Sequence, residues 1–472
     1  MTSAIVVGSG PNGLGAAAVL ARAGVDVTVL EAADTIGGGT RSSQLTVPGL
    51  VHDDCSAVHP MVIASPLFRR LQLDGLTWRN TDVDCAHPLD DGTAGAFARS
   101  FDRTDELLGA DGARWRRLFG APAAHFDDLF DDVSQPLLRV PRHPFTLARF
   151  GAPATLPATV LAKAFASPQA RALWMGVAAH AFWRLDRPMS SVLGMALTSA
   201  GHAHGWVVAE GGSQAIADAL AADIVRRGGT IETGIRVTSA ADLPPRDALL
   251  LDVSPSVAAG ILGDGLPSRV ARAYRRFRHG AAAFKVDFAV EGGVPWTAPA
   301  ARVAGTVHLG GDALEVAANE LEVHRGRMPD RPFVLVGQQY LADPGRSMGD
   351  VHPLWTYAHV PHGFTGDATE AIVAQIERFA PGFRDRVVAT AVRSTTELSR
   401  YNSNYVGGDI IGGASSFRQV VFRPRVAIDP YATGIDGVYL CSASTPPGAG
   451  AHGMCGANAA ARALRHLGIR TS

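Results

Sequence analysis

The feature that most constrains this chain lies within its first 31 residues. A short apolar segment over residues 4–7 leads into the glycine turn Gly8-Ser9-Gly10-Pro11-Asn12-Gly13, and an alanine-rich stretch follows over residues 14–23. The next segment, residues 25–30, is again apolar and ends at Glu31. This order predicts strand, glycine turn, helix, strand and acid, which is the pattern of a dinucleotide-binding unit.

Each part of this unit has a physical task. Gly8 permits the tight turn, Gly10 lets the backbone approach the pyrophosphate, and Gly13 lets the helix pack on the strand. The free N–H groups at the helix N-terminus favour the phosphates. Glu31 lies 23 residues after Gly8, where its carboxylate can accept the ribose hydroxyls. The expected contacts are Gly8, Gly10, Pro11, Asn12, Gly13, Glu31 and Ala32.

A second glycine cluster follows at residues 37–42. It resembles the GG-x-x-R element of the glutathione-reductase-like flavoprotein superfamily, which implies that the dinucleotide is FAD; an ordinary glycine turn is the alternative. The resemblance implies contacts from Gly38, Gly39, Thr40 and Arg41. The sequence shows no second strand–GxGxxG–helix unit and no C-x4-C pair, which argues against a disulfide reductase.

Composition narrows the classes of protein to which the chain could belong. The chain has 472 residues, 47% of them hydrophobic, with a net charge of −1, so we expect two or three domains and no nucleic-acid partner. The four cysteines stand apart, and the first residues show no cationic leader. These features favour a reducing bacterial cytoplasm. No apolar run of about 18 residues predicts a membrane span.

Residues 52–60 combine two histidines, two aspartates and a cysteine. Their spacing matches no standard metal-ligand set, and strand alternation would send them to opposite faces, so we expect no metal. We predict a loop that lines the flavin, with Ser56 and His59 as its polar members. A purely structural role for His59 is the alternative.

Residues 61–200 are expected to be mainly helical and to form a lid or line a substrate pocket. Within them, residues 138–149 mix arginines with apolar side chains. This segment suits a peripheral membrane contact, but a solvated helix face is the commoner outcome.

The chain then returns to the nucleotide sheet. A helix is predicted over residues 215–227, and strands over 230–237 and 248–253. In the flavoprotein superfamily a backbone group near the position of Val237 contacts the adenine. Asp252, Ser254 and Pro255 end a strand on the expected cofactor side, and Ser254 is a predicted contact.

These segments predict an α/β fold with a discontinuous Rossmann-like FAD-binding domain. We assign to it residues 1–60, 201–280 and 420–472. Residues 61–200 form the helical lid region. Residues 281–419 are rich in strands and form a mixed α+β substrate domain, with a long helix over residues 367–379.

A glycine-rich segment ends the chain. The strand over residues 436–441 leads into a glycine turn that includes Gly450, His452, Gly453 and Met454, and a helix is predicted over residues 457–467. A helix N-terminus there would stabilise the negative charge of a reduced flavin. Cys455 suits small-residue packing better than a covalent flavin bond.

Five stretches together resemble the phytoene-desaturase-related flavoprotein family, and its PYROXD2-like branch more than the true carotenoid desaturases. They are residues 6–24, 52–60, 210–221, 407–410 with 422–425, and 438–460. The resemblance covers nearly the whole chain. It implies non-covalent FAD and the oxidation or isomerisation of an apolar small molecule; oligomeric state and electron acceptor stay open.

The candidates for proton transfer are His452, His59, Asp409 and Tyr405, with His452 first because its loop should face the flavin. An ordering role in that loop is the alternative for His452. Three functions are ranked: a desaturase or dehydrogenase, an amine or amino-acid oxidase, and an FAD-stabilised interaction protein without turnover.

Overall fold

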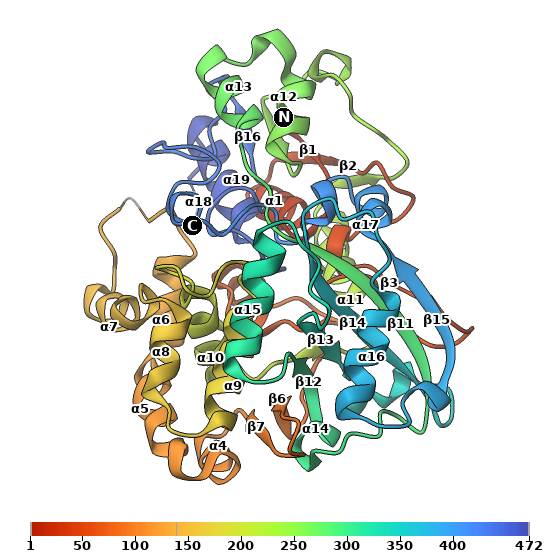
Figure 1. The fold of residues 1–472 in the computed structure, drawn as a ribbon. Coiled ribbons are helices and arrows are strands. Elements are labelled where there is room, and N and C mark those ends of the chain that lie inside the picture. Colours follow the sequence, from red (N-terminus) through yellow and green to blue (C-terminus); the bar gives the residue numbers. More distant parts are fainter. Residues whose placement is uncertain (1, 138, 471–472) are drawn as a thin grey trace.

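A parallel sheet forms the upper part of the molecule in Figure 1. The computed structural model describes residues 2–137 and 139–470. The five strands, in spatial order, are β16 (Val438–Leu440), β10 (Ala248–Leu251), β1 (Ser3–Val7), β2 (Asp26–Leu30) and β9 (Thr230–Glu232). All four pairings are parallel, so their carboxyl ends share one edge.

Helices cover both faces of this sheet. One core contains side chains of α1 (Pro11–Arg22), α11 (Gln214–Arg226) and α19 (Met454–His466). The other contains side chains of α12 (Pro255–Leu262) and α13 (Ser268–Arg275). The central strands β1 and β10 are buried on both faces, as their continuous apolar runs predict, while β9 is an exposed edge strand.

The second large sheet of the molecule is mixed and has seven strands. In spatial order the strands are β15 (Val387–Arg393), β11 (Ala282–Glu291), β14 (Val351–Val360), β13 (Val334–Gly337), β12 (Ala304–Leu309), β6 (Val83–Pro88) and β7 (Ala94–Phe97). β12 and β6 are parallel, and the other neighbours are antiparallel.

The two faces of the mixed sheet are buried differently. On β13, Leu335 packs with α9 (Pro168–Ala179) and α15 (Ala313–His324), while Val334 and Val336 pack with α16 (Thr369–Phe379). This alternation is the period of two expected of a strand.

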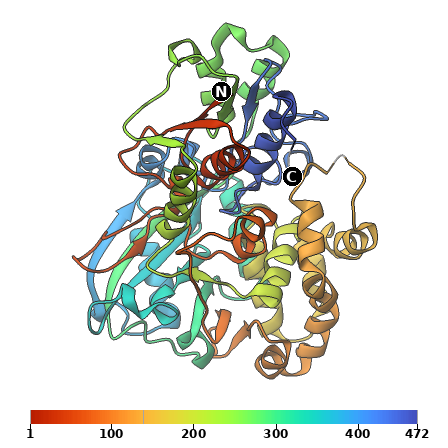
Figure 2. The ribbon, with the colours of Figure 1, turned by 180° about the vertical axis from the view of Figure 1, so that it is seen from behind.

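Helices fill most of residues 61–200, at the side of the mixed sheet seen in Figure 2. They are α2 (Pro60–Ile63), α3 (Pro66–Leu71), α4 (Phe101–Leu108), α5 (Gly112–Ala124), α6 (Phe126–Val133), α7 (Pro144–Ala154), α8 (Ala158–Leu161), α9 and α10 (Val192–His204). Leu138, the first residue of the predicted membrane-contact segment, lies outside the described residues.

The structure corrects two sequence expectations. Residues 83–97 are not helical but supply β6 and β7 to the mixed sheet, because Val83–Pro88 is buried along its whole length and shows no alternation to reveal a strand. The strand expected over residues 230–237 ends at Glu232.

The remaining short elements connect these layers. They are β3 (Ser42–Ser43), β4 (His52–Asp53), β5 (Trp78–Arg79), β8 (Val208–Ala209), α14 (Pro299–Arg302), α17 (Thr395–Tyr401) and α18 (Phe417–Val421). Within the described ranges, every helix is too short or too polar to cross a membrane.

Candidate active site

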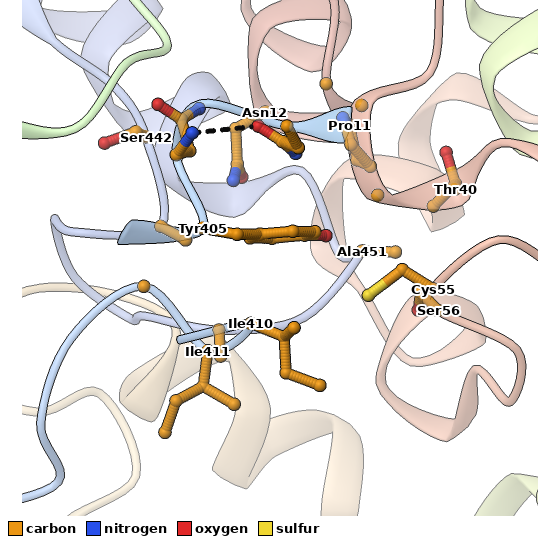
Figure 3. A pocket seen from close by; sticks show the side chains of 18 of the residues that line it. Pro11, Asn12, Thr40, Cys55, Ser56, Tyr405, Ile410, Ile411, Ser442 and Ala451 are labelled. Carbon is orange, nitrogen blue, oxygen red and sulfur yellow. Dashed lines mark hydrogen bonds between the residues drawn. The ribbon is translucent and has the colours of Figure 1, made fainter. Parts of the chain in front are cut away.

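One cavity of about 500 Å³ runs from the carboxyl edge of the parallel sheet to the mixed sheet. Segments from both ends of the chain line it, as Figure 3 shows for Pro11, Thr40 and Ala451. The predicted contacts on its wall are Gly8, Gly10, Pro11, Asn12, Glu31, Ala32, Gly38, Gly39, Thr40, Arg41, Val237, Ser254 and Gly450. Gly13, His452, Gly453 and Met454 do not line it.

The first glycine turn forms a close-fitting cradle. Gly8 has a φ of +100°, which favours glycine. A Cβ on Gly10 would lie 2.8 Å from the Asp252 carboxylate, and one on Gly13 would lie 2.0 Å from the Gly8 carbonyl oxygen. Gly13 therefore acts by letting α1 approach the turn, while Gly10 presents backbone to the cavity. α1 begins with Pro11, which has no N–H, and its first residue has no side-chain cap. Leu14 N–H donates to the Gly10 carbonyl oxygen and Gly13 N–H to Asp252, so Asn12 N–H is the group left to face a ligand at this end of the helix.

Glu31 ties the turn to the end of β2. One oxygen of its carboxylate accepts hydrogen bonds from the Ser9 backbone N–H (2.9 Å) and the Ser9 hydroxyl (2.6 Å), and the other accepts from Ala33 N–H (2.9 Å). The Arg41 guanidinium lies 3.5 Å away. Glu31 thus holds this part of the cavity wall in place.

Asp252 is a member of the site that the sequence placed only at a strand end. Its carboxylate lies under the glycine turn and accepts a hydrogen bond from Gly13 N–H (2.9 Å). Burial, and then the charge of Glu31, raises the pKa of Asp252 to about 7. The carboxylate lies on the inner side of the glycine turn. Its hydrogen bond with Gly13 joins residues far apart in the sequence, so the spacing of motifs could not predict it.

The two glycine turns meet at the start of α19. A Cβ on Gly453 would lie 3.2 Å from the Pro11 carbonyl oxygen. His452 is buried within its own loop: Nδ1 accepts from Met454 N–H (3.1 Å), and Nε2 lies 3.2 Å from the Ala449 carbonyl oxygen. Burial lowers the pKa of His452 to about 4. The structure therefore places its ring where it orders the loop, away from the cavity wall.

Two of the other proton-transfer candidates face the cavity. His59 lines it, and its Nε2 lies 2.8 Å from the Ser213 hydroxyl; burial lowers its pKa to about 4. Tyr405 extends its ring across the cavity toward Gly39 (Figure 3). Burial raises the pKa of Tyr405 well above its ordinary value, so the phenol is a hydrogen-bond donor and not a base.

Asp409 lies off the cavity. Its carboxylate accepts from Gly280 N–H (3.0 Å) and Ile411 N–H (3.0 Å) and lies 3.1 Å from Nδ1 of His279. These bonds hold the loop that carries Ile410 and Ile411 against the cavity, so Asp409 acts on the site through that loop.

Cys455 begins α19 as a buried thiol. Its Sγ lies 3.4 Å from the carbonyl oxygens of Thr445 and Gly448, and burial raises its pKa to about 12. A protonated, enclosed thiol suits packing and not covalent attachment of a flavin.

The end of the cavity at the mixed sheet is apolar and aromatic. Trp355 and Tyr357 alternate with Thr356 on β14 and point to the same side, with ring centroids 5.1 Å apart and planes at 87°. Phe182, Leu193, Leu197, Trp206 and Leu335 complete this end. His180 and Thr306 are its polar members, and the sequence singled out neither as a catalytic candidate.

Comparison with known proteins agrees with this architecture. A family model described as an NAD(P)-binding Rossmann-like domain matches residues 6–71. The mouse pyridine nucleotide-disulfide oxidoreductase domain-containing protein 2 is 24% identical over 98% of this chain and 93% of its own length. Hydroxyneurosporene desaturase of Cereibacter sphaeroides is 30% identical over 55% of this chain and 58% of its own length. A putrescine oxidase structure superposes with a TM-score of 0.60 at 18% identity, covering 99% of both chains.

The Rossmann-like FAD-binding fold and its cavity define an FAD-dependent oxidoreductase. The fold, a parallel nucleotide sheet joined to a second, mixed sheet, is shared with the putrescine oxidase structure. The Rossmann-like domain and these relatives support a flavin as the cofactor.

Proposed function

We propose that this protein binds FAD non-covalently and dehydrogenates or isomerises an apolar small molecule. The observation that carries this proposal is the single cavity that connects the nucleotide loops to an aromatic end. Such a cavity brings an apolar ligand beside the cofactor and excludes water from it.

The residues present suit FAD. The Gly8–Gly10 turn and the start of α1 would take the pyrophosphate, and Glu31 would take the ribose. Gly39 leaves room where a Cβ would collide with Tyr405. The backbone at Val237 would contact the adenine, and the loop at Gly450 would meet the flavin ring.

When bound, FAD supplies a two-electron acceptor for hydride. The chain's own contribution is to orient and enclose the substrate. Phe182, Trp355 and Tyr357 shape the apolar end, and the loop ordered by His452 presents Gly450 and Ala451 to the cavity. The PYROXD2-like branch remains our assignment, supported by the full-length mouse relative.

The test is an anaerobic screen of the purified, FAD-loaded protein. Squalene, geranylgeraniol, putrescine and cyclohexylamine are added separately, and the flavin absorbance is followed. We expect an isoprenoid to bleach the flavin. Bleaching by neither isoprenoid contradicts the dehydrogenation, and recovery of both isoprenoids with unmoved double bonds contradicts the isomerisation.

An amine oxidase is the second candidate. The perpendicular pair of Trp355 and Tyr357 and the fold shared with putrescine oxidase favour it. An aerobic assay with the two amines distinguishes the two candidate functions. An amine oxidase releases hydrogen peroxide, and its flavin is bleached by the amines but not by the isoprenoids. FAD bound without reduction by any of the four compounds would favour a protein without turnover.

A further inference from the structure

Two histidines from distant parts of the chain form a direct pair beside the cavity. His180 follows the last turn of α9, and His308 lies in β12. Their Nε2 atoms are 2.9 Å apart. His308 is fully buried, and its Nδ1 lies 3.4 Å from Sγ of Cys85 on β6.

The pair can exist in two hydrogen-bonded arrangements. One imidazole must donate its Nε2 proton and the other must accept it. When His180 donates, its Nδ1 carries a lone pair; when His308 donates, Nδ1 of His180 carries the proton. A proton added at Nδ1 of His180 can therefore pass through the Nε2–Nε2 contact to His308, whose Nδ1 already carries a proton that it can donate to Sγ of Cys85.

The outer nitrogen of the pair is open to the cavity. His180 lines the cavity, and among residues 2–137 and 139–470 its Nδ1 has no hydrogen-bond partner. Thr306 lies on the same wall, on the strand of His308, and its buried hydroxyl is likewise unpaired within the described chain. These two polar groups, at an otherwise apolar end, are therefore accessible to a ligand or to water in the cavity.

The packing around the pair keeps it in place. A Cβ on Gly176 would lie 2.9 Å from Nδ1 of His308 and 2.5 Å from Nδ1 of His87. The rings thus fill the space that a larger residue in α9 would need. The described residues contain no cluster of three or more ligating side chains suited to a metal.

We propose that His180, backed by His308, accepts the proton that the substrate loses at the end of the cavity formed by the mixed sheet. This inference rests on the proposed dehydrogenation. His180 is the group that meets the substrate, and His308 and Cys85 are positioning residues.

In a desaturation, one hydrogen would leave its carbon as hydride and carry two electrons to the bound flavin. The neighbouring carbon gives its proton to Nδ1 of His180, and the electron pair of that C–H bond becomes the second bond of the alkene. The Nε2 proton of His180 is shared with His308. The hydride and the stored proton leave together when a two-electron acceptor, oxygen or a quinone, reoxidises the cofactor.

Burial makes this pair a temporary acceptor. It lowers the pKa of His180 to about 3 and that of His308 well below its ordinary value, so both rings are neutral before reaction. The lone pair is therefore available at neutral pH, and the proton is not retained after turnover.

The first test needs no substrate. The FAD-loaded full chain is labelled with 15N in histidine, and long-range 1H–15N spectra assign each ring nitrogen at pH 7. We expect two neutral imidazoles that share one strongly hydrogen-bonded proton, lost in both H180Q and H308Q. C85A should shift the His308 signals alone. A charged His180, or a His180 signal unchanged in H308Q, would overturn the pair.

The second test measures flavin reduction by whichever of the four screened compounds bleaches the flavin. H180Q should slow reduction by about 10²–10⁴-fold with little change in the concentration for half-saturation. H204Q is the matched control, since His204 is also of intermediate burial but pairs with Asp127 off the cavity. Equal rates in H180Q and wild type would refute the proton role. If no compound bleaches the flavin, the proposed function is wrong. The 1H–15N spectra still test whether His180 and His308 share a proton, because they need no substrate.

Discussion

Gly456 of α19 lies against the backbone of Asn12 in α1: a Cβ on Gly456 would be 1.7 Å from the Asn12 carbonyl oxygen. The contact joins the first and last helices of the nucleotide domain. A second glycine, Gly15, lies close to Gly453 in the same interface, where a Cβ would be 3.1 Å from the Gly453 carbonyl oxygen. The geometry of the cofactor cradle therefore depends on the absence of side chains between these helices.

Gly456→Ala should separate α1 from α19. Overpacking of this kind costs about 1–3 kcal/mol and moves the backbone, so we expect lower stability in urea and loss of bound flavin. Gly260→Ala is the control, because among the described residues no atom lies within 4 Å of a Cβ at Gly260 in α12. Gly260→Ala should leave the free energy of unfolding unchanged or raise it by up to about 1 kcal/mol. Equal flavin content in both variants would contradict the role of the contact.

Glu31→Ala should weaken FAD binding. It removes the carboxylate that would accept a hydrogen bond from the ribose of FAD, and a hydrogen bond to a charged group contributes about 1.5–3 kcal/mol. This corresponds to about a 10- to 150-fold higher Kd, measurable by fluorescence titration of the apoprotein. Glu232→Gln, an exposed carboxylate on the neighbouring β9, should leave the Kd unchanged.

Acid should destabilise the protein through its buried histidines. Burial lowers the pKa of His59 and His452 to about 4, below the ordinary 6.5, so the unfolded state binds more protons between these values. Their contribution is complete above pH 6.5 and is lost as the pH falls through 4, at up to about 1.4 kcal/mol per pH unit for each group. Between pH 7.5 and 4.5, the free energy of unfolding of His59→Gln should fall less steeply with falling pH than that of the wild type. An unchanged pH dependence would contradict this role of His59.

Asp252 should make stability depend on pH in the opposite direction, and Asp252→Asn should remove that dependence. The folded pKa of about 7 exceeds the ordinary 3.8, so the folded state binds the extra proton and wild-type stability falls as pH rises from about 4 to 7. The amide keeps an acceptor for Gly13 N–H but carries no charge. We expect the variant to be more stable than wild type at pH 8, and to bind FAD more tightly there, since a buried anion beside the phosphates is removed. No gain at pH 8 would show that Asp252 is paired when ionised.

Val140 and Phe145 are 89% and 90% exposed, beside Arg139 and Arg142. We propose that they touch a membrane surface that supplies the apolar substrate. Changing both to serine should reduce co-sedimentation with phosphatidylglycerol vesicles several-fold. Ile428→Ser, 88% exposed elsewhere, is the control. Equal sedimentation of all three proteins would favour a solvated face.

The sequence determined the elements whose signals are local. The first glycine turn is flanked by strands buried on both faces, and its spacing to Glu31 follows from one strand and one helix, so chain order alone sets that geometry. The C-terminal turn was likewise visible as glycines before a helix. Strand patterning also indicated a mixed sheet beyond residue 280.

The tertiary structure decided what depends on distant partners. β6 and β7 could not be assigned from residues 83–97, because their burial comes from β12 and α9. The orientation of the His452 ring depends on a hydrogen bond that Nδ1 accepts from Met454 N–H. The orientation of Asp409 depends on a hydrogen bond from Gly280 N–H. His180 and His308 are 128 residues apart, and each is an ordinary histidine in an apolar segment until folding joins them. A single side chain carries no periodic signal, so its chemistry is fixed only by the surface that the fold places against it.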